Sequence, residues 1–462
     1  MNPTHTTRRQ FIAQTAAAAF TLAADGASAQ TMPRKPLEKV RVGFVGVGWK
    51  GSAHLGTLLR LDGVEVRAVC DIVEAQCVEA QKQAERLGKK PPAAYFKGER
   101  DFVRMCETEE LDLVYTATPW EWHVPVCVAA LKNGKHAATE VPAALTLDEC
   151  WQLVELSEKQ GRHCVMMENT NYQRPELGIF NMVRKGLLGE LVHGEGGYMH
   201  DTRYLKIKDT DDGLWLGAHH ATRNGNLYPT HGMGPLAWYM NINRGDRLEH
   251  LVSMSSNARG MNLYAKEHLP EGHPNRRDYR NGDVNTSLIR TANGLSITIK
   301  HDTDLPRPYS RTNLVQGTRG IVRGYPEFKV CLEANSKNNY LKWEPGEAYL
   351  QEHMHPLWKL VDEKRLGFLD DKFPPGPITN GAVWKYLPVS ELASGDFLED
   401  YRLIEALRNG TDPDYDVYDA VTWSAIAPLS EQSVAKRSAA VEFPDFTRGK
   451  WKTMPPVKIM GV

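Results

Sequence analysis

The chain has 462 residues, of which 41% are hydrophobic, and a formal net charge of −1. This length allows two domains with buried cores. The near balance of charge argues against a nucleic-acid partner. Six of the seven cysteines precede residue 165 and stand in apolar surroundings. We therefore expect buried thiols rather than disulfides. We also expect no metal site, because the chain has no CxxC or HExxH motif.

The first residues predict a targeting segment. Thr7–Ile12 reads TRRQFI, which is typical of twin-arginine export signals. An apolar stretch from Phe11 to Leu22 follows, and Ala27–Ala29 offers small residues for cleavage. The alternative is an N-terminal helix that frays. We predict a signal peptide over 1–29, a linker over 30–39, and export by the twin-arginine machinery to the periplasm or the medium. No later run reaches the length needed to span a membrane.

Strands and helices are predicted to alternate between residues 40 and 168. The expected strands are Val40–Val45, Val64–Cys70, Leu111–Thr116, His136–Thr139 and Val165–Met167. The expected helices run from the glycines to about Leu61, then over Glu74–Leu87, His123–Asn133 with Gly134 as its C-cap, and Leu147–Gln160. This alternation predicts a doubly wound parallel Rossmann sheet.

The pattern changes at Asn169. Strand-like runs, namely Leu251–Ser255, Thr286–Arg290 and Ser296–His301, alternate with long loops rich in glycine, asparagine and arginine. Residues 169–462 are therefore predicted to form an α+β substrate-binding domain with a large, mostly antiparallel sheet. Helices over Phe397–Leu407 and Ala420–Ala435 are expected to pack back between the domains, and Pro374–Pro377 to form a surface loop.

A glycine motif follows the first predicted strand and opens a helix. Gly46, Gly48 and Gly51 have the GxGxxG spacing, which lets a pyrophosphate approach the backbone at a helix N-terminus. Asp71 closes the second strand, where a carboxylate binds the adenosine ribose and repels a 2′-phosphate. We therefore predict NAD as the cofactor. The alternative is a structural glycine turn beside a solvated aspartate.

Two stretches resemble the glucose–fructose oxidoreductase/inositol dehydrogenase superfamily. They are His123–His136, which reads HVPVCVAALKNGKH, and Glu140-Val141-Pro142. The resemblance implies a Rossmann domain followed by a sheet-based substrate domain, and a homo-oligomer. Dehydrogenases of this superfamily carry Glu-Lys-Pro, with a lysine that assists hydride transfer. Val141 replaces that lysine here, which argues against an ordinary dehydrogenase mechanism.

More stretches, which cover nearly all of the mature chain, are similar to glycoside hydrolase family 109, the NAD-dependent α-N-acetylgalactosaminidases. They are 118–123 (TPWEWH), 140–144 (EVPAA), 168–172 (ENTNY), 197–201 (GYMHD), 223–232 (RNGNLYPTHG), 305–310 (LPRPYS), 416–424 and 443–451. The resemblance implies that NAD is lined by Trp49, Lys50, Asp71, Trp120, Glu121, Trp122, His123, Glu140, Val141 and Asn169, and the sugar by Tyr198, Tyr228, Pro229, Thr230, His231 and Tyr309. Tyr172 and His231 would be the reactive pair.

The chain also departs from this family at two places. Members carry Trp-Arg twelve residues before the tyrosine of Tyr-Pro-Thr-His, and the arginine contacts the substrate, whereas this chain has Trp215-Leu216. A Gly-Gly-Met-Asp stretch is replaced by Ser394-Gly395-Asp396-Phe397. Leucine cannot replace the forked donor of arginine at a sugar site, so the sequence leaves the sugar and its anomer open.

The sequence signals no pair of carboxylates of the kind that most glycosidases use. Bound NAD offers another route, in which the C3 hydroxyl is oxidised, C2 is deprotonated, the aglycone leaves by elimination, water adds, and the returning hydride restores the sugar. Histidine suits the proton of the C3 hydroxyl because its pKa lies near neutrality. Tyr172 is a candidate for C2 if neighbouring charge acidifies its phenol.

Other interpretations stay open. His231 could be a helix-capping histidine in a loop, and Tyr172, Tyr198 and Tyr309 could be packing rings. For the whole protein, the main hypothesis is a glycosidase acting on N-acetylgalactosaminides or related glycosides. The alternatives are an exported sugar oxidoreductase that makes or consumes 3-keto sugars, and a non-catalytic sugar sensor.

Overall fold

The computed structural model describes residues 35–210, 213, 215–333, 342–363 and 389–461, with the backbone alone for 389–394. The predicted signal peptide, residues 30–34 of the predicted linker and the predicted loop Pro374–Pro377 lie outside the described residues. Within the described part of the chain, no helix has both the length and the apolar character needed to cross a membrane. The same part contains no group of three or more histidine, cysteine, aspartate or glutamate side chains arranged to hold a metal ion.

The N-terminal part forms a six-stranded sheet in the order β3-β2-β1-β4-β5-β6. All neighbouring strands are parallel, so the predicted Rossmann sheet is confirmed. The strands are β1 (Val40–Val45), β2 (Val64–Cys70), β3 (Ala93–Tyr95), β4 (Leu113–Thr116), β5 (His136–Thr139) and β6 (Cys164–Met166). The helices are α2 (Trp49–Leu58), α3 (Glu74–Arg86), α4 (Asp101–Thr108), α5 (Trp120–Lys132) and α6 (Leu147–Gln160).

Local signals in the sequence explain where several of these elements begin and end. β1 is buried along almost its whole length, as expected for a parallel strand that is covered on both faces. Helix α6 begins with a capping box between Thr146 and Glu149 and ends at Gly161 in the left-handed conformation. Helix α5 begins at Trp120, earlier than the predicted His123, because Trp120 is buried and belongs to the apolar face.

The C-terminal part forms a nine-stranded sheet in the order β14-β13-β12-β11-β7-β10-β9-β8-β15. Its neighbouring strands are antiparallel except for β7 and β10, so the prediction of a mostly antiparallel sheet is confirmed. The strands are β7 (Leu191–Met199), β8 (Leu248–Ser255), β9 (Asn285–Thr291), β10 (Ser296–Asp302), β11 (Leu314–Gly317), β12 (Gly320–Arg323), β13 (Lys329–Leu332), β14 (Glu344–Pro345) and β15 (Val441–Glu442).

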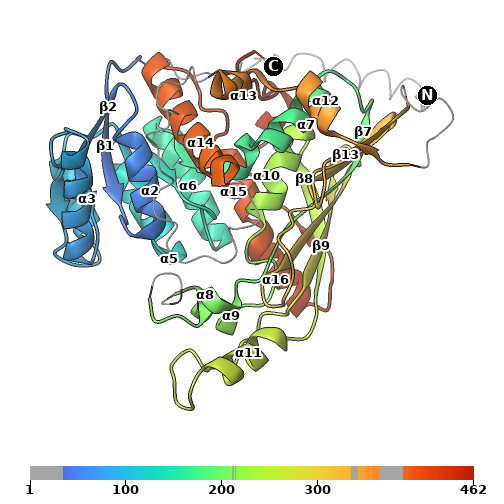
Figure 1. Cartoon of the computed structure of the whole chain (residues 1–462), viewed down its shortest axis with the longest axis horizontal. Coiled ribbons are helices and arrows are strands. Elements are labelled where there is room, and N and C mark those ends of the chain that lie inside the picture. Colours follow the sequence, from blue (N-terminus) through green and yellow to red (C-terminus); the bar gives the residue numbers. More distant parts are fainter. Residues whose placement is uncertain (1–34, 211–212, 214, 334–341, 364–388, 462) are drawn as a thin grey trace, which may run out of the picture. The chain divides into compact units, whose positions relative to one another are not determined.

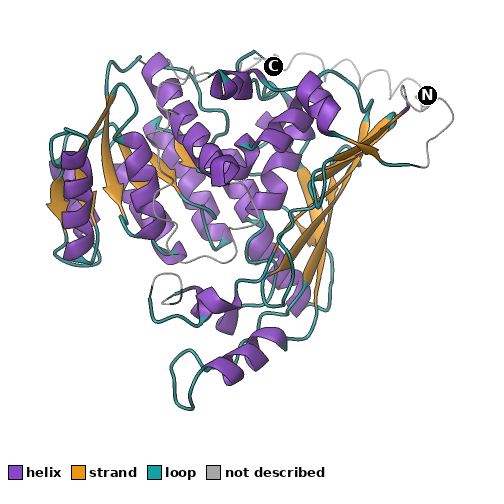
Figure 2. Ribbon diagram, in the orientation of Figure 1, coloured by secondary structure: helices purple, strands orange, loops and turns teal. Residues whose placement is uncertain are grey.

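Helices cover one face of this sheet, and the opposite face bears no helix in the described part of the chain (Figure 2). The helices after β6 are η1 (Asn169–Tyr172), α7 (Arg174–Arg184), α8 (Arg203–Lys206), α9 (Leu216–Thr222), α10 (Thr230–Tyr239), α11 (Gly260–His268), α12 (Glu347–Glu352), α13 (Pro356–Asp362), α14 (Val389–Asn409), α15 (Val417–Ser424), α16 (Ile426–Ala435) and η5 (Lys450–Lys452). Helix α10 packs on β7, and α16 packs on β8.

Two late helices also pack against the first sheet and its helices. Helix α14 contacts α2 and η1, and α15 contacts α6 and β6 (Figure 1). The single helix predicted over Ala420–Ala435 is wrong, because the chain breaks at Ala425 into α15 and α16. Pro428 stands in the first turn of α16 and has no N–H for a bond to a preceding turn, which explains the break.

Candidate active site

The three glycines of the predicted nucleotide motif differ in their surroundings. Gly46 has a φ of 79°, which favours glycine, and a Cβ on Gly51 would overlap the carbonyl oxygen of Gly46. A Cβ on Gly48 would meet nothing within 4 Å. Two glycines therefore make the tight turn and the close approach of α2, and the third leaves the space that a pyrophosphate needs.

Asp71 lies beside this turn, at the end of β2. Its carboxylate accepts hydrogen bonds from the backbone N–H groups of Val47 and Val73, both at 2.9 Å. It therefore holds the glycine turn and stands where an adenosine ribose would bind. The residues present fit NAD.

The other predicted cofactor residues fall into two groups, of which the first lies at the start of α5. Trp120 is buried, and Trp122 packs edge-on against Phe102 with 6.1 Å between ring centroids. The ring nitrogens of His123 lie 2.7 Å from Pro142 O and 2.9 Å from Thr118 O. His123 therefore braces the loops after β4 and β5 and does not present its own ring to a ligand.

Trp49 and Glu121 lie nearer the surface. The side chain of Trp49 is 51% exposed, and the carboxylate of exposed Glu121 lies 3.4 Å from the ring of His219 in α9. Both stand at the first position or turn of a helix that follows a strand of the Rossmann sheet. They are therefore placed at the carboxyl edge of that sheet, where nucleotides bind in this fold.

The second group converges on an aspartate that the sequence analysis did not assign to the site. Nζ of Lys50 lies 2.6 Å from Asp396 and 3.5 Å from Glu140. The amide of Asn169 donates to the other carboxylate oxygen of Asp396. The carbonyl oxygen of the Asn169 side chain is buried and has no hydrogen-bond partner among the described residues, so it can accept a bond from a ligand. Val141, the residue that replaces the superfamily lysine, is buried.

The predicted sugar residues form an aromatic cluster. The ring of Tyr198 lies 4.4 Å from Tyr228 and 6.4 Å from Tyr309, and the ring of Tyr228 lies 5.8 Å from Trp120. All three tyrosines are half-buried, so a face or hydroxyl of each can meet a ligand. The cluster thus connects the cofactor loops to the predicted sugar residues, and planar rings of this kind stack on sugars.

Helix α10 brings His231 to this cluster through contacts between glycine backbones. A Cβ on Gly196 of β7 would overlap Gly232, and a Cβ on Gly232 would overlap Gly197. The start of α10 can therefore touch β7, which puts the His231 ring 5.2 Å from Tyr198 and 4.8 Å from Tyr228. Pro229 and Thr230 are buried at the same turn and support the helix start rather than face solvent.

His231 has a carboxylate partner that the sequence analysis did not predict as a functional residue. Nδ1 of His231 lies 2.6 Å from Glu168, which is fully buried at the end of β6. The Thr170 hydroxyl donates to the same oxygen at 2.7 Å. Burial alone would raise the pKa of Glu168, but the His231 ring and these hydrogen bonds hold it below its usual value. The pair fixes the imidazole and leaves Nε2 without a partner among the described residues. In the sequence, the feature that pointed to a functional role for Glu168 was its position directly after a predicted parallel strand.

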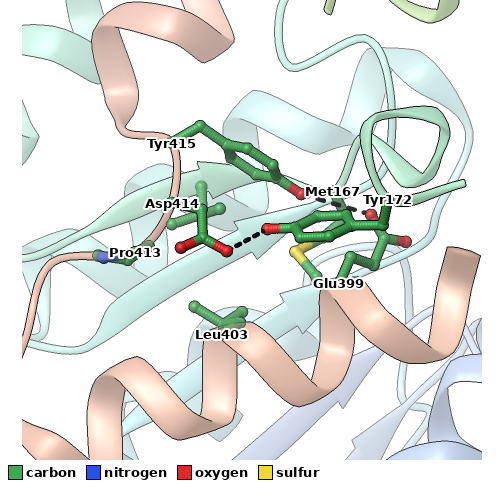
Figure 3. A pocket seen from close by; sticks show the side chains of 8 residues that line it. Met167, Tyr172, Glu399, Leu403, Pro413, Asp414 and Tyr415 are labelled. Atoms are coloured by element: carbon green, nitrogen blue, oxygen red, sulfur yellow. Dashed lines mark hydrogen bonds between the residues drawn. The ribbon is translucent and has the colours of Figure 1, made fainter. Parts of the chain in front are cut away.

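Tyr172, the other predicted reactive residue, is oriented differently. Its side chain is buried, and its hydroxyl donates to Asp414 at 2.8 Å (Figure 3). The same carboxylate pairs with Arg402 at 2.6 Å. Burial, followed by the charge of Asp414, raises the pKa of Tyr172 well above its usual value. The expectation that nearby charge acidifies this phenol is therefore wrong. No hydrogen bond links Tyr172 to His231 in the described structure, and each residue has its own carboxylate.

A small cavity of about 10 Å³ borders the Tyr172 ring. Figure 3 shows Tyr172, Glu399, Asp414 and Tyr415 around it, with Leu403 on the side of α14. A volume of this size holds about one water molecule when polar groups line it.

Two family models match the chain. Residues 40–168 match the oxidoreductase family with an NAD-binding Rossmann fold, and residues 172–367 and 389–453 match the C-terminal domain of glycosyl hydrolase 109. A glycosyl hydrolase family 109 protein of Shewanella pealeana is 44% identical over 450 residues, which is 94% of each chain. A protein of Shewanella oneidensis named alpha-N-acetylgalactosaminidase is 42% identical over 432 residues, 92% of this chain and 89% of that one.

Solved structures show the same fold at lower identity. A levoglucosan dehydrogenase in complex with NADH and L-sorbose superposes with a TM-score of 0.64 at 18% identity, over 88% of this chain and 100% of that one. An oxidoreductase domain protein from Kribbella flavida has a TM-score of 0.63 at 16% identity, with the same coverage. The chain therefore belongs to glycosyl hydrolase family 109 and is an NAD-dependent glycoside hydrolase on a Rossmann scaffold.

Proposed function

We propose that this enzyme hydrolyses N-acetylgalactosaminides or a related glycoside while NAD stays bound through every turnover. The observation that carries the proposal is the buried contact of 2.6 Å between Glu168 and His231, beside the tyrosine cluster. The Shewanella oneidensis relative, named for its action on such a sugar, supports the substrate class.

The proposed chemistry takes place on the sugar. Bound NAD supplies a reversible oxidation of the C3 hydroxyl to a ketone. The ketone acidifies the neighbouring C2–H bond, and loss of that proton expels the aglycone from C1 by elimination. Water then adds at C1, a proton returns to C2, and the ketone is reduced to the original hydroxyl. The net reaction is hydrolysis with no net oxidation.

His231 is the proposed base for the C3 hydroxyl. Its Nδ1 faces Glu168, so Nε2 is the nitrogen that can accept the proton. The carboxylate then stabilises the imidazolium that forms, because opposite charges in contact at a buried site attract strongly. A positioned base of this type contributes about 10²–10⁴-fold in rate.

The proposed acceptor of the C2 proton is Tyr172 acting together with Asp414. The phenol is neutral at rest, since burial raises its pKa. It could take a proton from carbon only by passing its own proton to a base, and the Asp414 carboxylate lies 2.8 Å from its oxygen. The proposal therefore makes this aspartate, which the sequence did not point to, part of the base.

The half-buried rings of Tyr198, Tyr228 and Tyr309 are proposed to bind the sugar by stacking and through their hydroxyls. Leu216, which replaces the family arginine, is the first residue of α9 and follows Trp215, whose ring lies 5.2 Å from Trp120. Leucine has no hydrogen-bond donors to replace those of arginine. We therefore expect an aglycone or ring substituent that does not require hydrogen bonds from a guanidinium group at this place.

A second candidate function is a sugar oxidoreductase that makes or consumes 3-keto sugars, which the match of residues 40–168 to an oxidoreductase family with an NAD-binding Rossmann fold favours. The buried Val141 opposes it, because the superfamily lysine is missing.

The test follows an aryl glycoside by release of its aglycone and, in the same cuvette, by absorbance at 340 nm. A glycosidase releases aglycone over many turnovers with no stoichiometric reduction of added NAD. If reduced cofactor accumulates in step with substrate loss, the oxidoreductase replaces the glycosidase as the conclusion.

A further inference from the structure

Helix α14 faces α2 through two matched pairs of charges. Asp396 and Asp400 are four residues apart on α14, and Lys50 and His54 are four residues apart on α2. Residues at this spacing share one face of a helix, so the two carboxylates meet the two cations in register. We call these four residues the ionic ladder. Figure 1 shows the two helices side by side.

The first rung also joins the loop after β6. Nζ of Lys50 lies 2.6 Å from one oxygen of Asp396, and Asn169 donates to the other. Gly395 permits this approach, since a Cβ there would lie 2.9 Å from Asn169 O. One carboxylate of α14 thus ties together two residues that are expected to line NAD.

The second rung is deeper. Nδ1 of His54 lies 2.9 Å from Asp400, and Nε2 lies 2.8 Å from Glu140. The side chains of His54 and Asp400 are completely buried. Burial alone would lower the pKa of His54, but its carboxylate neighbours hold it well above its usual value. Both ring nitrogens face carboxylate oxygens, which favours the protonated ring. Glu140 bridges the rungs because it also lies 3.5 Å from Lys50.

We propose that Asp396 and Asp400 are positioning residues of the cofactor site, which lock α2 and the glycine turn in place so that NAD does not leave between turnovers. The pyrophosphate is expected at the N-terminus of α2, the end that carries Lys50. The ionic ladder along this helix opposes movement of its first two turns. Such a movement would open the glycine turn and release the cofactor.

The proposed redox-neutral cycle needs such retention, because an enzyme that lost its reduced cofactor would stop. The role of the ladder in catalysis rests on that proposed function, but the experiment that tests the ladder does not. Release of NAD is measured without any glycoside, so failure of the ladder and failure of the glycosidase are distinguishable.

The experiment uses the holoenzyme variants Asp396→Asn and Asp400→Asn, which keep the side-chain shape and remove the charge. Release of NAD after dilution is followed by mass spectrometry of the retained protein, and the melting temperature is measured with and without added NAD. We expect at least tenfold faster release and a smaller NAD-dependent rise in melting temperature for both variants.

Asp419→Asn is the matched control. Asp419 is a buried aspartate of α15 that pairs with Arg244 at 2.6 Å and bonds to no predicted cofactor residue. We expect it to lower the melting temperature in both conditions and to leave NAD release unchanged. If the ladder variants release NAD no faster than Asp419→Asn, the ladder is ordinary packing and the inference is overturned.

A double variant tests whether Asp396 acts through Lys50. Lys50→Met removes the cation itself. If Asp396 acts by holding that cation, Lys50→Met with Asp396→Asn should release NAD no faster than Lys50→Met alone. If the increases in NAD release rate of the two single variants multiply in the double variant, the two residues act independently, which contradicts the ladder.

Discussion

At the scale of single residues, the imidazole of His231 is oriented by a carboxylate that belongs to the other sheet. Glu168 follows β6 of the Rossmann sheet, whereas His231 begins α10 on the nine-stranded sheet. Their contact forms only when Gly196 and Gly232 let α10 touch β7. The base is therefore assembled by packing between segments that lie 63 residues apart.

We predict that His231→Ala lowers kcat by about 10²–10⁴-fold, because a positioned base is lost. Glu168→Gln keeps a hydrogen-bonding group of the same shape but removes the charge that stabilises the imidazolium, so we expect a loss at the lower end of that range. Both are measured as aglycone release, with bound NAD checked by mass spectrometry. Full activity of Glu168→Gln would show that the carboxylate only packs.

The sequence predicted part of this site and missed the rest for physical reasons. His231 and the tyrosines stand in short motifs, so their neighbours in the chain identify them. Asp396 and Asp414 act through contacts with Lys50 and Tyr172 that span 346 and 242 residues. No local pattern reports such contacts. The protonation of Tyr172 depends on burial, which spacing cannot give.

At the scale of elements, strands buried on both faces were the easiest to predict. β1 and β2 begin and end at the predicted residues, because most of their side chains are apolar and both strands pair on each side within the parallel sheet. The three-residue strand β3 and helix α4 were missed. β3 pairs on one side only, at the edge of the sheet, so its sequence needs no apolar run. The strands β11–β14 were missed because each has only two to four residues, too few for a clear pattern of apolar side chains.

The ionic ladder also gives a pH dependence. Because the folded-state pKa of His54 is raised, its charge is fully present below the ordinary histidine pKa and is lost as pH rises through the higher folded value. We predict that NAD release is slow and flat around neutral pH and accelerates on the alkaline side. The His54→Gln variant should release NAD faster near neutrality and lack the alkaline limb.

Other titratable groups face His54 and belong to the same measurement. They are Asp400 and Glu399 on α14, Glu140 after β5, Lys50 on α2 and the Tyr115 hydroxyl on β4. Burial raises the pKa of Asp400 and of Tyr115, so protonation of Asp400 would weaken the rung on the acid side. An alkaline limb that persists in His54→Gln would assign it to Tyr115 or Lys50 and contradict the prediction.

At the scale of the whole molecule, the proposed export would depend on retention of the cofactor. We propose that residues 1–29 direct the folded protein through the twin-arginine pathway, which would require NAD to be loaded beforehand. Protein isolated from the periplasm or the medium should then contain NAD. Arg8→Lys with Arg9→Lys should keep it in the cytoplasm with the same NAD content. Exported protein that contains no NAD would contradict this link.

The outer face of the nine-stranded sheet is exposed, with Met254 at 66% and Leu288 at 52% accessibility on the adjacent strands β8 and β9. Exposed apolar side chains on an uncovered sheet face are typical of association surfaces. Homo-oligomerisation stays a prediction, and sedimentation velocity measures it.

The complete cycle predicts where isotopes appear in the product. If oxidation at C3 and elimination operate, C2 is deprotonated in every turnover, so hydrolysis in heavy water should leave deuterium at C2 of the released sugar. The hydrogen at C3 should be retained, because the same cofactor returns it without exchange with solvent. A glycosidase with two carboxylates never breaks the C2–H bond and would leave C2 unlabelled.

Variants show which residue carries out each step of this cycle. Tyr172→Phe removes the proposed C2 base but leaves His231 and the cofactor in place. It should therefore still show a change at 340 nm in a single turnover, while deuterium entry at C2 falls by about 10²-fold or more. His231→Ala should lose both signals, because no ketone forms to acidify C2. Hydrolysis in heavy water by the unaltered enzyme with no deuterium at C2 would exclude the redox cycle. Unchanged labelling in Tyr172→Phe would instead move the C2 base to another residue, with Tyr198 and Tyr309 as the next to substitute.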